Sequence, residues 1–235
     1  RFSLGECVYT ISKKISRNRG KFNMTNLKII PEEKPDINKV QTCNLLDKSA
    51  LSKNLFTKEE CARIIEIGRS WEVINTQIQT KSSEEESETN DDYRNCKMYG
   101  PPIDETVGWL WIGQKISAAI YNFNAKEGWK FNLIGMAERP MLMEYEEGQG
   151  KYDWHMDLGP SRLASTRKLG FSLLLNDDYE GGEFQIKTGQ ENYIPAHQEA
   201  GTLLFFPSYL VHRVTLVTRG TRSAIVGWIT GNSFS

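Results

Sequence analysis

The feature that most constrains the fold of this chain is a series of short, β-rich runs that starts near residue 139. Seven runs rich in β-branched, aromatic and other apolar residues are separated by glycine, proline or Asn-Asp: PMLMEYEE, KYDWHMDL, KLGFSLLLN, GEFQIK, GTLLFFP, LVHRVTLV and RSAIVGWIT. Runs of this length between turn residues are typical of strands. So many strands in under a hundred residues predict a sandwich or a barrel.

Two helices are expected before these strands. Thr57-x-x-Glu60 forms a capping box at the start of an apolar pattern that ends near Gly68. A second helix is predicted over about 105–123, where apolar residues recur at helical spacing. The predicted fold class is therefore mainly β with flanking helices (α+β), with the N-terminal helices packed outside the β core.

The first 50 residues have a different character. Residues 1–23 are basic, and residues 24–50 mix prolines with charges. We expect residues 1–50 to be a basic leader and extended lead-in that is partly disordered, and residues 51–235 to form the functional domain. It is equally open whether Met24 is the biological start of the protein. Residues 81–92, KSSEEESETNDD, are expected to be a loop or flap, either simply solvated or attracting a basic peptide.

Composition excludes several classes of protein. The 235 residues carry a net charge of −1, which gives no general attraction to nucleic acid or to an anionic membrane. No apolar run is long enough to span a bilayer. The four cysteines are scattered without a C-x-x-C pair, which favours free thiols in a reducing, cytoplasmic compartment.

Three residues from two of the predicted strands are candidate metal ligands. His155 and Asp157 are two positions apart, and side chains at i and i+2 of a strand share one face, so Met156 should face away. His212 lies on another predicted strand. Two histidines and one carboxylate form the triad that leaves coordination positions open on iron(II). His197, beside a turn, is interpreted as an ordinary histidine.

Arg222 is the candidate anion-binding residue. It comes ten residues after His212, at the start of the next apolar strand, and a guanidinium grips a carboxylate in two-pronged fashion. A metal ion with open coordination positions, together with an arginine that can bind a carboxylate, suggests a keto-acid cosubstrate. Arg222 can share a face with His212 across a hairpin only if the loop has three residues, 219–221. This loop would pair His212 with Trp228, and Gly220 would adopt a left-handed conformation.

The region 140–231 resembles the iron(II)/2-oxoglutarate dioxygenases, in particular the prolyl-hydroxylase-like branch that includes PKHD-type hydroxylases. The resemblance is carried by EYEEGQGKYDWHMD, LLLNDDYEGGEFQI and AGTLLFFPSYLVHRVTLVTRGTRSAIVGWI. It implies a double-stranded β-helix (jelly-roll) fold, with His155, Asp157 and His212 as iron ligands. It also implies that Arg222 binds the distal carboxylate of 2-oxoglutarate and that Tyr145 hydrogen-bonds this cosubstrate.

The resemblance implies hydroxylation of an unactivated C–H bond, with Fe(2+), 2-oxoglutarate and O2 consumed and L-ascorbate in support. Decarboxylation of 2-oxoglutarate would release succinate. A protein or peptide substrate, modified at proline, is favoured over a small molecule. Two further hypotheses stay open: a metal-binding β-barrel without catalysis, and a zinc hydrolase, for which no general base is evident.

Aromatic and cysteine residues leave further alternatives. Tyr152, Trp154, Trp109 and Trp111 could line a substrate groove, although burial against the sheet is favoured for the last two. Cys61 and Cys96 are expected to be packed thiols and not nucleophiles.

Overall fold

The computed structural model describes residues 9–11, 29–31, 48–74, 93–102, 106–188, 191–193 and 199–232. The chain divides into two compact units, residues 1–42 and residues 43–235. In the first unit, β1 (Tyr9–Ile11) pairs with β2 (Ile29–Pro31). The predicted acidic loop 81–92 and His197 lie outside the described residues.

All seven predicted runs contain strands of the second unit. These strands are β8 (Met141–Glu146), β9 (Lys151–His155), β10 (Arg167–Leu174), β12 (Phe184–Thr188), β14 (Leu203–Pro207), β15 (His212–Val214), β16 (Val217–Arg219) and β17 (Thr221–Gly231). The run LVHRVTLV is divided between β15 and β16. The prediction of a β-rich core from short, punctuated runs is therefore confirmed.

The strands described in this unit form two main antiparallel sheets. The larger has eight strands in the order β3-β14-β10-β17-β8-β6-β4, with β7 also paired to β17, and the smaller has the order β13-β12-β15-β9-β5. A separate pair joins β11 to β16. The remaining strands are β3 (Ala50–Ser52), β4 (Glu72–Val73), β5 (Arg94–Asn95), β6 (Lys97–Gly100), β7 (Leu133–Gly135), β11 (Glu180–Gly181) and β13 (Glu191–Tyr193).

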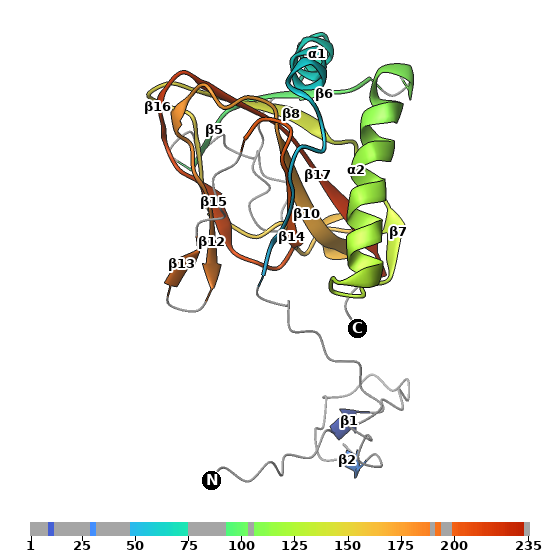
Figure 1. Ribbon diagram of the computed structural model, residues 1–235. Helices are drawn as coiled ribbons and strands as arrows, with labels where there is room; N and C mark the ends of the chain where they lie inside the picture. Colours follow the sequence, from blue (N-terminus) through green and yellow to red (C-terminus); the bar gives the residue numbers. More distant parts are fainter. Residues whose placement is uncertain are drawn as a thin grey trace, which may run out of the picture. The chain divides into compact units, whose positions relative to one another are not determined.

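The helices described are α1 (Lys58–Arg69), α2 (Thr106–Lys126) and the short 3-10 helix Ala164–Thr166. The capping box predicted for α1 is present: the Glu60 amide donates to Thr57 Oγ1, and the Thr57 amide donates to Glu60 Oε2. In Figure 1, α2 runs along the larger sheet beside β10 and β17, and α1 lies near β6 and β8. In this part of the chain, no helix has both the length and the apolar character needed to cross a bilayer.

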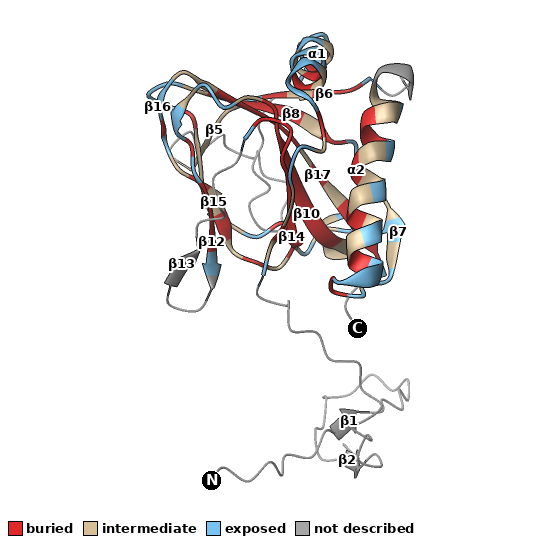
Figure 2. Ribbon diagram, viewed as in Figure 1, coloured by how far each residue is buried: buried red, intermediate tan, exposed pale blue. Residues whose placement is uncertain are grey.

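Side-chain alternation on the larger sheet separates two cores, which appear as buried segments in Figure 2. On one face, Leu169, Phe171 and Ile225 pack with residues of both helices. On the other face, residues such as Tyr145 and Phe206 pack against residues of the smaller sheet. The two sheets therefore face each other across this second core, and the strands that carry the predicted site residues border it.

The hairpin predicted at residues 219–221 is wrong. The strand that follows Gly220 leaves β15 and β16 and enters the larger sheet, where β17 pairs with β10 and β8. His212 is opposite His155, and Trp228 is opposite Gly170. Gly220 does adopt a positive φ of 76°, but it serves a crossing between two sheets.

Candidate metal and anion site

The three predicted metal-ligating residues lie together. One ligand atom from each of His155, Asp157 and His212 falls within 4.8 Å of the other two. The Nε2 atom of His155 is 4.0 Å from Asp157 Oδ1, and that of His212 is 3.7 Å from Asp157 Oδ2. All three side chains are nearly inaccessible to solvent, with exposures of 10%, 8% and 5%. This spacing suits a single ion held between them.

Pairing of β9 with β15 brings the two histidines face to face. His155, the last residue of β9, is directly opposite His212, the first residue of β15. Between the pairs His212–His155 and Val214–Tyr152, β9 has one extra residue, which makes a β-bulge. The bulge changes the alternation of β9, so that Tyr152 and His155 both face the site. Their rings stack 3.5 Å apart.

Asp157 is positioned differently from the prediction, which placed it on the same strand as His155. The strand ends at His155, and the amides of Asp157 and Leu158 both donate to the Ser208 carbonyl. Met156 is 54% exposed and does face away from the site, as predicted. The carboxylate is therefore presented by a short segment anchored to the neighbouring chain beyond the strand end.

Hydrogen bonds orient both imidazoles. Nδ1 of His155 lies 2.7 Å from the Asp153 carbonyl, and Nδ1 of His212 lies 2.9 Å from the Leu210 carbonyl. Because a carbonyl oxygen can only accept, each Nδ1 must carry the proton. Each Nε2 then has a free lone pair directed at the space beside Asp157, which is the arrangement that a metal-binding histidine needs.

Burial keeps His155 in its neutral form. Loss of solvent lowers the pKa of His155 to about 2, and the neighbouring His212 also lowers it. The His212 ring is enclosed by aromatic neighbours, with the Phe206 ring 4.6 Å away and the Phe184 ring 5.3 Å away. Two imidazoles and a carboxylate in a site of this kind suit a divalent cation.

Arg167 and Gly170 support the Asp157 segment, a role that the sequence did not indicate. Arg167 Nη1 donates to the Asp157 carbonyl at 3.0 Å, while its Nε and Nη2 bind both carboxylate oxygens of Glu138. The Arg167 guanidinium also stacks 3.6 Å from the Trp228 ring. A Cβ atom at Gly170 would be only 2.3 Å from Asp157 Oδ2, so a side chain there would displace the carboxylate.

Arg222 and Tyr145 face the space between the sheets from the larger sheet. They are directly opposite each other on β17 and β8, and the guanidinium carbon is 5.5 Å from the Tyr145 ring. Arg222 is 1% exposed, and its Nε and Nη2 have no hydrogen-bond partner. Burial raises the pKa of Tyr145 well above its usual value, so its hydroxyl stays protonated and can donate.

The aromatic residues proposed for a groove separate into two groups. Trp109 and Trp111 pack against the helical core, 6.2 Å from the Trp71 ring and 5.7 Å from the Phe56 ring respectively, as favoured from the sequence. Tyr152 borders the site, whereas the Trp154 ring lies 4.5 Å from the Arg213 guanidinium. Among the described cysteines, Cys61 and Cys96 are free thiols.

A β-sandwich that holds two histidines and one carboxylate at the end of a space between its sheets has the donor set of the non-haem iron(II) oxygenases. The comparison with protein families agrees: residues 140–230 match the profile of the 2OG-Fe(II) oxygenase superfamily, where 2OG is 2-oxoglutarate. This segment of the chain is therefore similar to that superfamily.

Curated proteins that are similar to this chain include PKHD-type hydroxylases. One from Synechococcus sp. (strain CC9311) is 42% identical over 121 residues, which are 50% of this chain and 52% of that protein. Another, from Synechococcus sp. (strain CC9902), is 38% identical over 104 residues, 42% of this chain and 44% of that protein. The chain thus spans about half the length of the curated relatives that it matches.

Solved structures extend the similarity in fold. A prolyl hydroxylase from Trichoplax adhaerens, in complex with a hypoxia inducible factor peptide fragment, superposes with a TM-score of 0.63 at 18% identity. The match covers 78% of this chain and 84% of that one. A Pseudomonas putida prolyl-4-hydroxylase gives a TM-score of 0.60 at 14% identity, covering 79% and 93%. The second unit therefore has a mostly β fold similar to that of the prolyl hydroxylases.

Proposed function

We propose that this protein is an Fe(II)- and 2-oxoglutarate-dependent dioxygenase that hydroxylates an unactivated C–H bond. In this proposal His155, Asp157 and His212 bind the iron, Arg222 binds the distal carboxylate of 2-oxoglutarate, and Tyr145 donates a hydrogen bond to the cosubstrate. Residues 51–235 form the catalytic domain. We assign its two opposed sheets to a double-stranded β-helix. The similarity in fold to prolyl hydroxylases supports this topology.

The observation that carries the proposal is an unpaired, buried Arg222 in the space that the metal ligands border. Burial of a guanidinium without hydrogen-bond acceptors is costly, so such a group indicates an anionic ligand. A metal-binding barrel without a cosubstrate, or a zinc hydrolase, gives no reason for this cation. The donor set also fits iron(II), because two imidazoles and a carboxylate leave coordination positions for a bidentate keto acid.

Each residue then has a definite task. Bound iron and 2-oxoglutarate supply the oxidising chemistry, with release of succinate and carbon dioxide. The backbone carbonyls of Asp153 and Leu210 keep both imidazoles turned with Nε2 toward the metal position. Arg222 and Tyr145 set the direction of the cosubstrate, and the surrounding aromatic residues limit the access of water to the site.

The substrate that we favour is a prolyl residue in a protein or peptide, and a small molecule is the alternative. Support comes from two of the solved structures with a similar fold, which are prolyl hydroxylases. L-Ascorbate is expected to sustain turnover by keeping the iron reduced. Free Cys61 and Cys96 are consistent with the cytoplasm or another reducing compartment.

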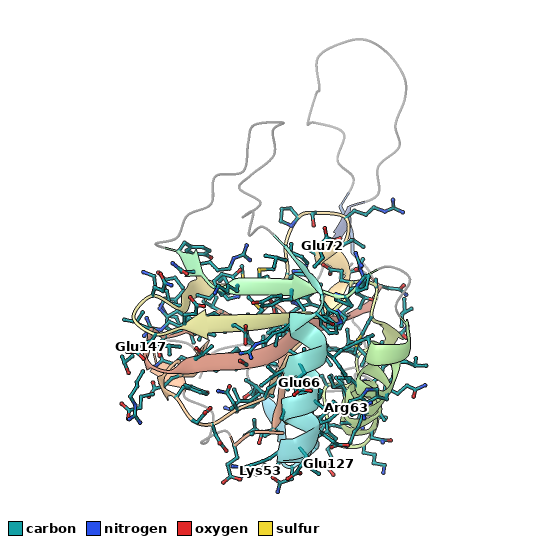
Figure 3. The ribbon with its side chains drawn as sticks, turned by 90° about the horizontal axis from the view of Figure 1, so that it is seen from above. Lys53, Arg63, Glu66, Glu72, Glu127 and Glu147 are labelled. Atoms are coloured by element: carbon teal, nitrogen blue, oxygen red, sulfur yellow. The ribbon has the colours of Figure 1, made fainter. Side chains whose placement is uncertain are left out.

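The test combines spectroscopy with turnover. Anaerobic protein with Fe(II) and 2-oxoglutarate should develop a visible charge-transfer absorption, and admission of oxygen with ascorbate should release succinate. His212→Ala should lose iron binding, whereas Arg222→Gln should keep iron and weaken 2-oxoglutarate binding by about 100-fold, since a buried charge-assisted pair is lost. Arg63→Gln, on the exposed side of α1, is the matched control (Figure 3).

Neither an absorption band nor succinate from the wild-type protein would favour a metal-binding barrel without catalysis. An unchanged 2-oxoglutarate affinity in Arg222→Gln would contradict the assignment of the anion anchor.

A further inference from the structure

A second arginine, Arg94, also faces the candidate site. Arg94 lies on β5, directly opposite Tyr152 on β9, and side chains of directly opposed residues point to the same face of a sheet. The guanidinium carbon of Arg94 is 5.2 Å from the Tyr152 ring, and this ring stacks on His155. Arg94 is therefore separated from a proposed iron ligand by one aromatic ring.

The charge of Arg94 reaches several groups in this region. Burial raises the pKa of Tyr152 to about 12, and Arg94 opposes this rise through its charge and a hydrogen bond to Tyr152. Burial likewise raises the pKa of Cys96 to about 12, again against the charge of Arg94. These are apolar or hydroxyl neighbours, and none of them supplies a negative charge at neutral pH.

Arg94 has no carboxylate partner among the residues that the structure describes, and its Nε is buried without any hydrogen-bond partner. Other arginines in the same part of the chain are paired: Arg69 with Glu144, Arg167 with Glu138, and Arg219 with Glu180. Only Arg94 and Arg222, within these described ranges, have buried side-chain guanidinium nitrogens that lack a partner. Both lie close to Tyr145, whose pKa their charges lower against the effect of burial.

Two guanidiniums that each have a buried N–H group without a partner offer more donors than 2-oxoglutarate alone satisfies in the proposed arrangement. In the proposed function, one carboxylate of the cosubstrate binds Arg222 and the other, with the keto oxygen, binds the metal. In this arrangement Arg94, on the opposite sheet and near the proposed iron ligand His155, binds neither carboxylate of the cosubstrate. A guanidinium presents five N–H donors in a planar fork that matches a carboxylate. None of the residues that the structure describes supplies a third carboxylate in this position, and we assign it to the substrate.

We propose that Arg94 is a substrate-binding residue, and that the substrate of this enzyme carries a carboxylate near the carbon that is hydroxylated. This inference rests on the proposed function and adds the substrate class. The carboxylate belongs either to the end of a free amino acid or peptide chain, or to an acidic side chain. Tyr152, in contact with both Arg94 and His155, spaces the carboxylate from the metal.

Binding under anaerobic conditions tests the assignment without turnover. The protein with Fe(II) and 2-oxoglutarate is titrated calorimetrically with N-acetylated amino acids, each as the free acid and as its primary amide. At least one acid should bind, and should bind at least about tenfold more tightly than its amide. Arg94→Gln should remove this preference and Arg94→Lys should restore part of it, whereas Arg63→Gln should keep it.

Peptides distinguish the two sources of the carboxylate. If the protein binds a peptide with a free C-terminus more tightly than its C-terminal amide, the carboxylate belongs to a chain end. If it binds a peptide with an internal Glu more tightly than the same peptide with Gln, the carboxylate belongs to a side chain. The charge-transfer band of bound 2-oxoglutarate should be unchanged in Arg94→Gln, because Arg222 holds the cosubstrate.

Four results would overturn the inference: no acid binds, acids and amides bind equally, the preference survives in Arg94→Gln, or Arg94→Gln weakens 2-oxoglutarate. The last result would assign Arg94 to the cosubstrate. Absence of the band in the wild-type protein would instead overturn the proposed function, and this inference with it.

Discussion

The three candidate metal ligands are held by contacts with backbone groups. Both site histidines donate Nδ1–H to carbonyls two residues before them, and Asp157 is fixed through its own backbone by Ser208 and Arg167. Polar contacts of this kind fix a tautomer and a direction without adding a competing charge. The geometry of the triad should therefore be sensitive to small steric changes nearby.

Gly170 is the position where such a change is best defined. In Gly170→Ala, the new methyl group would meet Asp157 Oδ2 and Phe206, so the carboxylate must shift from its present position beside the histidines. We expect iron(II) affinity to fall by at least about tenfold, in line with the loss seen when the support of a metal ligand is removed. Equilibrium dialysis with iron analysis measures it.

Ser172→Ala, two residues along the same strand and on the same face, is the control and should bind iron normally. Iron binding by Gly170→Ala at the wild-type level would show that the segment carrying Asp157 can shift without cost.

The two described thiols should be inert. Burial raises the pKa of Cys61 to about 11 and that of Cys96 to about 12, so both remain protonated near neutral pH, where thiols react only as thiolates. In a Cys7→Ser/Cys43→Ser background, iodoacetamide at pH 7.5 should leave the native protein unlabelled by mass spectrometry. The same protein in guanidinium chloride should take two labels. Native labelling as fast as that of free cysteine would contradict the burial of these residues.

At the scale of elements, helix α1 depends on a local signal that the sequence reveals. Thr57 and Glu60 satisfy two amides at its start, while Cys61, Ile64 and Gly68 form its buried face. Gly68 is needed for close packing, since a Cβ there would be 2.7 Å from the Leu142 side chain. The capping box thus defines the start of α1, and the buried face of this helix packs against the larger sheet.

Removal of the cap should destabilise the second unit measurably. Thr57→Ala leaves the Glu60 amide without its acceptor, and we expect the free energy of unfolding to fall by about 1 kcal/mol. Urea denaturation followed by circular dichroism gives this value. Thr57→Ser keeps the hydroxyl and should lie much closer to the wild-type protein. Equal losses in both variants would mean that the hydroxyl does not act as a cap.

Strand pairing is the part of the element scale that local patterns did not predict. The run 210–217 divides because β15 pairs with β9 and β12, while β16 pairs with β11. Thr215 and Leu216 lie between the two strands. The bulge in β9 also arises from pairing, because only the partner strand defines which residue is extra. A hairpin at residues 219–221 was expected from strand parity, because it would place Arg222 on the same face as His212. In the structure, β16 and β17 belong to different sheets.

At the scale of the whole second unit, the site lies where two sheets face each other. The larger sheet contributes Arg222 and Tyr145, and the smaller contributes His155, His212 and Arg94. A ligand that bridges metal and Arg222 therefore contacts both sheets and should stabilise their association.

Ligand binding should accordingly raise the melting temperature. With anaerobic Fe(II), 2-oxoglutarate at 100 times its Kd should add about 2.7 kcal/mol to the free energy of unfolding. For a unit of this size the shift is about 5–10 °C. Scanning fluorimetry measures it, and Arg222→Gln should show a much smaller shift at the same concentration. Equal shifts in both proteins would place the cosubstrate away from Arg222.

The sequence by itself determined the strand-rich core, the start of α1 and the candidate ligands, because these depend on short-range properties. Alternation, turn residues and a capping box are read within a few positions of the chain. Residues that meet in space are chosen instead by packing over long sequence separations. Tertiary structure alone decided that β17 crosses to the larger sheet, that Arg94 lies opposite Tyr152, and that Gly170 leaves room for Asp157. Whether a buried cation is paired depends on every neighbour around it, and only the folded chain supplies those neighbours.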